Sequence, residues 1–118
     1  MTRRIPFSVV TKPTGAACNL DCQYCFFLSK ELLYDAGSQT MSEGTLERYV
    51  EAFLESSPDG EVTMLWQGGE PTLRGLGFFE RLIELCERYR RPTQRVRHAL
   101  QTNGTLVTEE WARFFADH

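Results

Sequence analysis

Three of the four cysteines lie close together near the N-terminus, as Cys18, Cys22 and Cys25 in the pattern C-x3-C-x2-C. Clustered thiols of this kind form disulfides, bind zinc or hold an iron–sulfur cluster. Three thiolates on one short loop can hold three irons of a [4Fe–4S] cluster and leave the fourth iron without a protein ligand. Such an open position is useful because a substrate or cofactor can bind the metal there. These residues therefore favour an iron–sulfur cluster.

The other two explanations need partners that this stretch lacks. An odd number of neighbouring thiols cannot pair off completely in disulfides. Zinc sites usually combine a C-x2-C pair with a second pair of Cys or His residues. Here the possible fourth ligands are single residues far along the chain: Cys86, His98 and His118. Zinc remains the alternative to the cluster.

Composition restricts the class of protein. The chain has 118 residues, of which 42% are hydrophobic and 25% charged, which is typical of one globular domain at most. Its net charge of −3 argues against a broad nucleic-acid interface. The sequence contains no apolar run long enough to span a membrane or to serve as a signal peptide. We expect a cytoplasmic protein, whose thiols stay reduced and available to metal.

Hydrophobic periodicity predicts three strand–helix units. Strands are expected at 5–11, 61–66 and 96–100. Helices are expected from the N-cap Ser42 to about residue 56, over 77–89, and after the N-cap Thr108. The continuous apolar character of 61–66 predicts a strand covered on both faces. Alternating units imply an α/β fold with a parallel sheet and right-handed crossovers. Three strands cannot close a barrel.

Several polar or reactive residues have a simple structural interpretation. Cys86 falls on the apolar face of the second helix and is expected to be a buried structural thiol. His98 lies within the third strand and is also expected to be structural. Arg90 and Arg91 are interpreted as solvated charges at a helix C-terminus. Asn103, before Gly104, is interpreted as a turn former.

The segment that follows the second strand reads Gln67-Gly68-Gly69-Glu70-Pro71. Two glycines let the backbone approach a ligand without a Cβ in the way, although a simple turn would also use them. Together with C-x3-C-x2-C and Tyr24 before the last cysteine, Gly68 to Pro71 resembles the motifs of radical S-adenosylmethionine (SAM) enzymes. The resemblance implies that Cys18, Cys22 and Cys25 bind a [4Fe–4S] cluster whose open iron is chelated by SAM. It further implies a partial parallel (β/α) barrel, of which 1–118 would supply the first three βα units.

In that family the motif after the second strand binds the amino group of SAM, largely through its backbone. The resemblance assigns this role to Gly68, Gly69 and Glu70, and places Tyr24 near the adenine. The carboxylate of Glu70 has an alternative role, which is to order the loop by accepting hydrogen bonds from backbone amides.

Longer stretches, from Trp66 to Leu73, from Leu100 to Leu106 and from Cys25 to Lys30, resemble anaerobic sulfatase-maturating enzymes. These enzymes oxidise a Cys or Ser of a sulfatase to Cα-formylglycine: a deoxyadenosyl radical takes a hydrogen atom from Cβ, a base takes a proton, and an electron passes to an auxiliary cluster. The resemblance implies a sulfatase polypeptide as substrate and an electron donor such as flavodoxin or ferredoxin. Gln67 and Gln101 could hydrogen-bond the peptide backbone, or merely cap the strand ends.

The resemblance lacks the family's later strands, its general base and the cysteines of its auxiliary clusters. We therefore interpret 1–118 as the N-terminal half of a radical SAM core domain and a fragment of a longer chain. The alternatives are another peptide-modifying radical SAM maturase that forms thioethers or cross-links, a structural zinc-binding module, or an inactive truncation.

Overall fold

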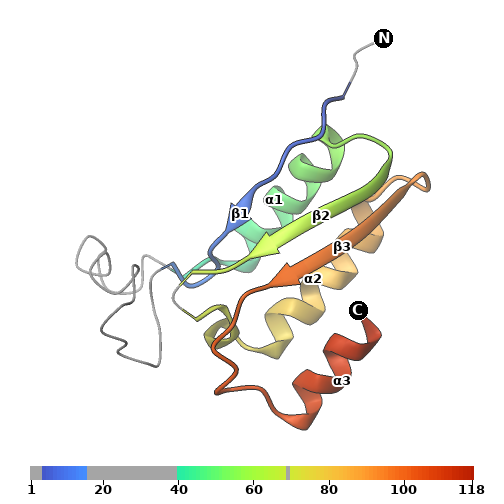
Figure 1. Ribbon diagram of the computed structural model, residues 1–118. Helices are drawn as coiled ribbons and strands as arrows, with labels where there is room; N and C mark the ends of the chain where they lie inside the picture. Colours follow the sequence, from blue (N-terminus) through green and yellow to red (C-terminus); the bar gives the residue numbers. More distant parts are fainter. Residues whose placement is uncertain (1–3, 16–39, 69) are drawn as a thin grey trace.

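The computed structural model describes residues 4–15, 40–68 and 70–118 (Figure 1). Three strands, β1 (Val10–Thr11), β2 (Gly60–Trp66) and β3 (Gln94–Leu100), form a parallel sheet in the order β1-β2-β3. Thr11 pairs with Trp66, and Trp66 pairs with Leu100, so the three strands end level with one another. The predicted α/β class and the parallel sheet are confirmed.

The first strand is much shorter than the predicted span 5–11. Only Val10 and Thr11 pair with β2, whereas residues 4–8 are exposed. Phe7 nevertheless contacts the helical residue Phe53, with ring centroids 5.2 Å apart. In this stretch Phe7 therefore packs against a helix and Ile5 stays exposed, while strand pairing is confined to Val10 and Thr11.

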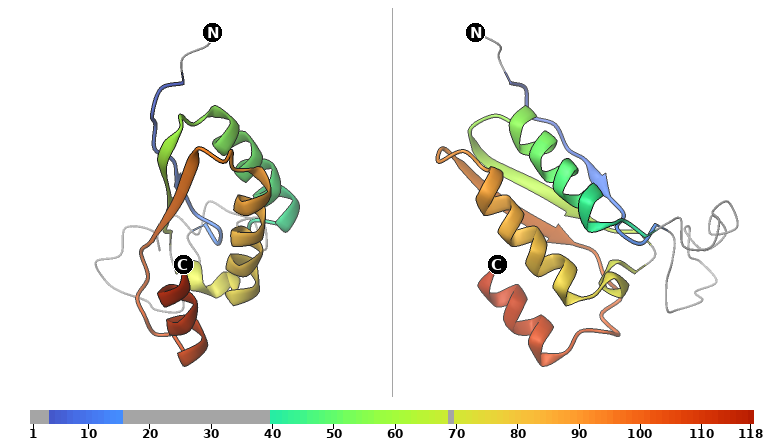
Figure 2. Two further views of the ribbon diagram at one scale, coloured as in Figure 1. Left: turned by 90° about the vertical axis from the view of Figure 1, so that its right-hand side faces the viewer. Right: turned by 180° about the vertical axis from the view of Figure 1, so that it is seen from behind.

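Two helices, α1 (Glu43–Ser56) and α2 (Leu76–Tyr89), lie side by side on one face of the sheet, as Figure 2 shows. A third helix, α3 (Glu109–Asp117), follows β3. The predicted N-caps are confirmed: the Ser42 side chain accepts from the Thr45 N–H at 3.1 Å, and Thr108 accepts from the Trp111 N–H at 3.4 Å. Each cap satisfies a backbone donor that the first helical turn leaves without a partner.

The hydrophobic core lies between the sheet and the helices. Trp66, which is 2% exposed, sits at its centre and makes edge contacts with Tyr49, Phe78 and Phe79. Burial of each such large side chain contributes about 1.5–3 kcal/mol. The helical residues that complete this core are Leu46, Val50, Phe53, Leu54, Leu82, Leu85, Cys86 and Trp111.

The opposite face of the sheet is not covered by the described residues. Along β2 the side chains alternate between buried Val62 and Met64 and exposed Glu61 and Thr63. The prediction that this strand is covered on both faces is therefore wrong for the described part of the chain. Both helices lie on the same side, so the alternate residues meet no second layer.

At the edge where the strands begin, polar side chains join the start of β3 to the end of α1. The Arg91 guanidinium donates to the carbonyl oxygens of Leu54 (3.1 Å) and Ser57 (2.6 Å), and the Gln94 amide donates to Leu54 (2.9 Å). The interpretation of Arg91 as a solvated charge is wrong, because it caps the C-terminus of α1 across the fold. Arg90 is half-buried and donates to Glu87 and to the Gln94 carbonyl.

Among the described residues, no helix combines the length and the apolar character that crossing a membrane requires.

Candidate ligand site at the ends of the strands

Three loops meet at the edge where the strands end. Gln67 N–H donates to the Thr11 carbonyl, and Gln101 N–H donates to the Trp66 carbonyl, each at 2.9 Å. These bonds extend the ladder beyond the strands and place Gln67 and Gln101 in neighbouring positions. Both line one shallow cavity of about 230 Å³ together with Val10, Leu65, Trp66, Ala99 and Leu100. The structure thus brings together the two glutamines that the sequence singled out.

The cysteine-bearing stretch is attached to this same edge. Cys18, Cys22, Cys25 and Tyr24 lie outside the described residues, as does Gly69. The residues on either side are described: Met41 N–H donates to the Pro13 carbonyl at 2.7 Å. The chain therefore leaves and re-enters the described structure next to the end of β1.

Gly68 brings the loop after β2 against the turn after β1. Its φ is +125°, a conformation that side-chain-bearing residues rarely adopt. A Cβ at this position would lie 2.4 Å from the Gly15 carbonyl oxygen. Only glycine fits this close approach, so the first glycine of the predicted motif has a requirement that a simple turn would not impose.

Glu70 is completely buried, with an exposed fraction of 0%. Its Oε2 accepts three hydrogen bonds. They come from the Thr72 N–H at 3.1 Å, from the Thr72 hydroxyl, and from the Thr102 hydroxyl, the last of these at 2.5 Å. Its Oε1 accepts from the Asn103 N–H at 2.6 Å. Burial alone would raise the pKa of this carboxyl, but the hydrogen bonds from Thr102, Thr72 and Asn103 outweigh it and leave the pKa below its usual value. These are the hydrogen bonds that the suggested loop-ordering role of Glu70 requires, including two from backbone amides.

The backbone of Glu70 continues the same network. Its carbonyl oxygen accepts from the Thr14 hydroxyl at 3.2 Å and from the Leu73 N–H at 3.2 Å. Its side chain also caps a 3-10 turn, Pro71–Arg74, which the sequence analysis missed. Proline directly after a capping acidic residue was the available signal, because proline suits the first position of a helical turn. Thr14, Thr72 and Thr102 were also missed, since a threonine carries no distinctive pattern.

Asn103 has the predicted turn-forming role. Its Oδ1 accepts from the Thr105 N–H at 2.9 Å and from the Thr105 hydroxyl at 2.8 Å. Gly104 follows with a φ of +78°. This is the local hydrogen bonding by which Asn side chains stabilise turns, and it holds the loop after β3 in shape.

Cys86 and His98 lie in the helix-facing layer, away from the strand ends. Burial raises the pKa of the Cys86 thiol to about 12, and its Sγ lies 3.8 Å from the Met64 Sδ. His98 Nδ1 accepts from the Trp66 indole N–H at 3.2 Å, and burial lowers the pKa of His98 to about 4. The predicted burial of Cys86 is confirmed, and His98 makes a structural hydrogen bond within the fold. Within the described ranges, no three His, Cys, Asp or Glu residues are arranged to hold a metal ion.

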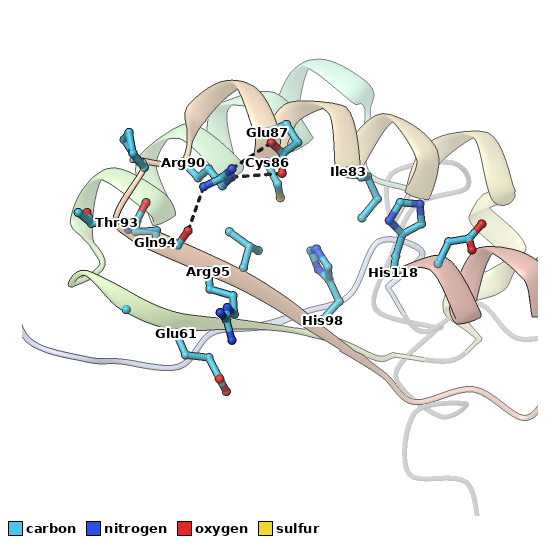
Figure 3. Close-up of a pocket in the computed structure, with 14 residues that line it drawn as sticks. Glu61, Ile83, Cys86, Glu87, Arg90, Thr93, Gln94, Arg95, His98 and His118 are labelled. Carbon is cyan, nitrogen blue, oxygen red and sulfur yellow. Dashed lines mark hydrogen bonds and ion pairs between the residues drawn. The ribbon is translucent and has the colours of Figure 1, made fainter.

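A larger cavity than the one beside the two glutamines lies elsewhere in the described structure. It has a volume of about 680 Å³ and runs along the helix-facing side of β3, as Figure 3 shows. Arg90 bridges Glu87 and the Gln94 carbonyl on its wall, and His98 and His118 lie toward its other end. It contains none of the motif residues. The strand ends, where parallel α/β sheets bind ligands, are the better candidate site.

The fold is that of an α/β protein with a parallel sheet, and its candidate ligand site is built from loops at the carboxyl edge of that sheet. Residues 13–118 match the Radical SAM superfamily, and the chain belongs to that superfamily.

Particular relatives are sulfatase-maturating enzymes. The chain is 39% identical over 114 residues to the serine-type anaerobic sulfatase-maturating enzyme of Bacteroides thetaiotaomicron, covering 96% of this chain and 27% of that protein. It is 40% identical to the cysteine-type enzyme of Clostridium perfringens, covering 96% of this chain and 30% of that protein. A solved structure described as "Native anSMEcpe with bound AdoMet and Cp18Cys peptide" is similar with a TM-score of 0.82 and 40% identity, covering 96% of this chain and 29% of the other. The chain thus spans less than a third of the length of these relatives, and both predicted resemblances are confirmed.

Proposed function

We propose that this chain is the N-terminal part of a radical SAM core, in which Cys18, Cys22 and Cys25 hold a [4Fe–4S] cluster. The observation that carries the proposal is the joining of three loops at one edge. The motif loop contacts the turn that precedes the cysteines through Gly68 and Gly15, and it meets the loop after β3 through Glu70. Cluster-binding and SAM-binding segments must lie side by side for SAM to reach the open iron.

SAM is proposed to bind against Gly68, Gly69 and Glu70, with Tyr24 beside the adenine. The described part of this segment fits that role, because Gly68 presents backbone without a side chain and carbonyl oxygens are the acceptors that an ammonium group needs. When bound, the cluster and SAM supply reductive cleavage of SAM and hydrogen abstraction, chemistry that belongs to the cofactors. The residues of this chain position the two groups and exclude water.

The proposed substrate is a sulfatase polypeptide, whose Cys or Ser would be oxidised to Cα-formylglycine. Support comes from relatives that are named as serine-type and cysteine-type anaerobic sulfatase-maturating enzymes, and from the peptide named in a similar structure. Gln67 and Gln101, adjacent at the strand ends, are proposed to hydrogen-bond the peptide backbone. The general base and the auxiliary clusters are proposed to belong to the part of the relatives' length that this chain does not span, and flavodoxin or ferredoxin is the proposed electron donor. A cytoplasmic location also remains a prediction.

The test is anaerobic reconstitution with iron and sulfide, followed by EPR of the reduced protein with and without SAM. A [4Fe–4S] signal that changes when SAM is added is the expected result. Cys18→Ala, Cys22→Ala and Cys25→Ala should each abolish the cluster. Cys86→Ala is the matched control, because this thiol is buried away from the strand ends, and it should retain the iron content of the wild type.

Two results would contradict the proposal. Equal iron content in all four variants would exclude the three clustered cysteines as ligands. Tight binding of zinc, with no response to SAM, would favour the structural zinc module.

A further inference from the structure

Glu70 joins two loops that are far apart in sequence. It belongs to the segment after β2, while Thr102 and Asn103, which lie more than 30 residues away along the chain, belong to the loop after β3. The contacts are close, at 2.5 Å from the Thr102 hydroxyl and 2.6 Å from the Asn103 N–H. Hydrogen bonds to an ionised carboxylate are about twice as strong as those between neutral groups. This carboxylate is therefore a strong link between the two loops.

The same residue is also tied to the turn after β1. Its carbonyl oxygen accepts from the Thr14 hydroxyl at 3.2 Å. Thr14 stands just before the cysteine-bearing stretch, and Gln101, the neighbour of Thr102, is a proposed substrate contact. Glu70 thus contacts all three loops of the candidate site.

The carboxylate has little capacity left for another partner. Three donors from Thr72 and Thr102 converge on Oε2, and the Asn103 N–H binds Oε1, so most of the carboxylate's four or so lone-pair sites are used. The side chain is also 0% exposed. A ligand at the strand ends would reach this carboxylate only if the network opened. The cofactor-binding role assigned to Glu70 thus falls to its backbone and its loop.

We propose that the Glu70 carboxylate is a positioning residue, which fixes the loop after β3 against the SAM-binding segment and touches neither cofactor nor substrate. The inference rests on the proposed function for the identity of the ligand, but the loop-fixing step concerns only residues of this chain. Thr102 directly follows Gln101, and the Thr102 hydroxyl donates to the Glu70 carboxylate. Thr102 is therefore the residue through which Glu70 holds the loop after β3.

The first test needs no cofactor. Amide hydrogen exchange is measured in the cofactor-free protein, comparing wild type with Glu70→Gln, Thr102→Val and Thr102→Ser. Exchange at the Asn103 amide should accelerate at least tenfold in Glu70→Gln and Thr102→Val, because the bond that protects this amide is lost or loosened. It should stay near wild type in Thr102→Ser, which keeps the hydroxyl. Amides inside β3, such as Val96, report whether the whole sheet has been destabilised.

The second test measures the affinity for SAM of the reconstituted proteins. Thr102→Val should weaken SAM binding about as much as Glu70→Gln, by roughly tenfold or more, and Thr102→Ser should restore it. Iron content should be the same in all four proteins.

Each contrary result has a definite meaning. Unchanged Asn103 exchange in Glu70→Gln would overturn the loop-fixing role. Loss of SAM affinity in Glu70→Gln with wild-type affinity in Thr102→Val would show that the carboxylate contacts SAM itself. If the wild-type protein takes up no SAM, the proposed function fails, and the exchange data still decide whether Glu70 holds the loops.

Discussion

Gly68→Ala tests the close approach of two loops at the site. The backbone conformation at φ +125° costs a side-chain-bearing residue about 1–3 kcal/mol. In addition, the new Cβ would lie 2.4 Å from the Gly15 carbonyl oxygen, so the loops must separate by about 1 Å to reach an ordinary contact. We expect the free energy of unfolding to fall by about 2–4 kcal/mol in total.

Gly60→Ala is the matched control. Gly60 has a φ of +94°, but an added Cβ would meet nothing within 4 Å. Gly60→Ala should therefore carry only the conformational cost, about 1–3 kcal/mol, without the added cost of separating two loops. Gly60 also lies at the opposite end of β2, away from the proposed ligand site.

The assay is urea unfolding followed by the fluorescence of the buried Trp66 and Trp111, with SAM affinity measured on the reconstituted proteins. Gly68→Ala should lose at least about 1 kcal/mol more than Gly60→Ala, and it should also lose SAM affinity, whereas Gly60→Ala should keep it. Equal losses of stability in the two variants would show that the contact with Gly15 relaxes freely, and would refute the requirement for glycine at residue 68.

Three further predictions concern stability. Burial lowers the pKa of His98 from 6.5 to about 4, so the unfolded chain binds a proton at this residue more readily than the folded chain does. The free energy of unfolding should therefore fall as the pH falls from about 6.5 to 4. His98→Asn, which keeps an acceptor for Trp66, should flatten this pH dependence when urea unfolding is measured at several pH values. The pKa of Glu70 is also lowered, so the Glu70 carboxylate stabilises the fold above pH 4.5, and this stabilisation should be lost as the pH falls below that value. Glu70→Gln should abolish this pH-dependent loss in acid titrations followed by circular dichroism. Leu54→Ala should cost about 2–5 kcal/mol by opening a cavity in the core, whereas the same change at Leu73, which is 41% exposed, should cost under about 1 kcal/mol in thermal unfolding.

Most of the fold could be predicted because its signals are local. Ser42 and Thr108 cap their helices as expected, and α2 was placed to within one residue of its observed start at Leu76. Helix periodicity and capping depend on neighbours within a turn. The length of β1 depends instead on pairing with β2, a distant contact, and its prediction was wrong.

The site was predictable only in part, for the same reason. The place of the motif residues and of the two adjacent glutamines could be predicted, because these residues directly follow predicted strands. Two contacts could not be predicted: the hydrogen bond from Thr102 to Glu70, and the hydrogen bond from Arg91 to the end of α1. Each joins residues more than 30 positions apart in the sequence. No periodicity or spacing signals such contacts, because they depend on the register of the folded sheet.

The hydrogen bond from Met41 to Pro13 has a practical consequence for protein engineering. The described residues on either side of 16–39 therefore lie close together, so a linker of different length can join the same two points. Loop-closure entropy changes by only about 0.6 kcal/mol for each doubling of length. Replacing 16–39 with a short glycine–serine linker should therefore give a folded scaffold that lacks all three clustered cysteines. Such a scaffold could receive the corresponding segment of a relative, which would make the cysteine-bearing stretch an exchangeable module.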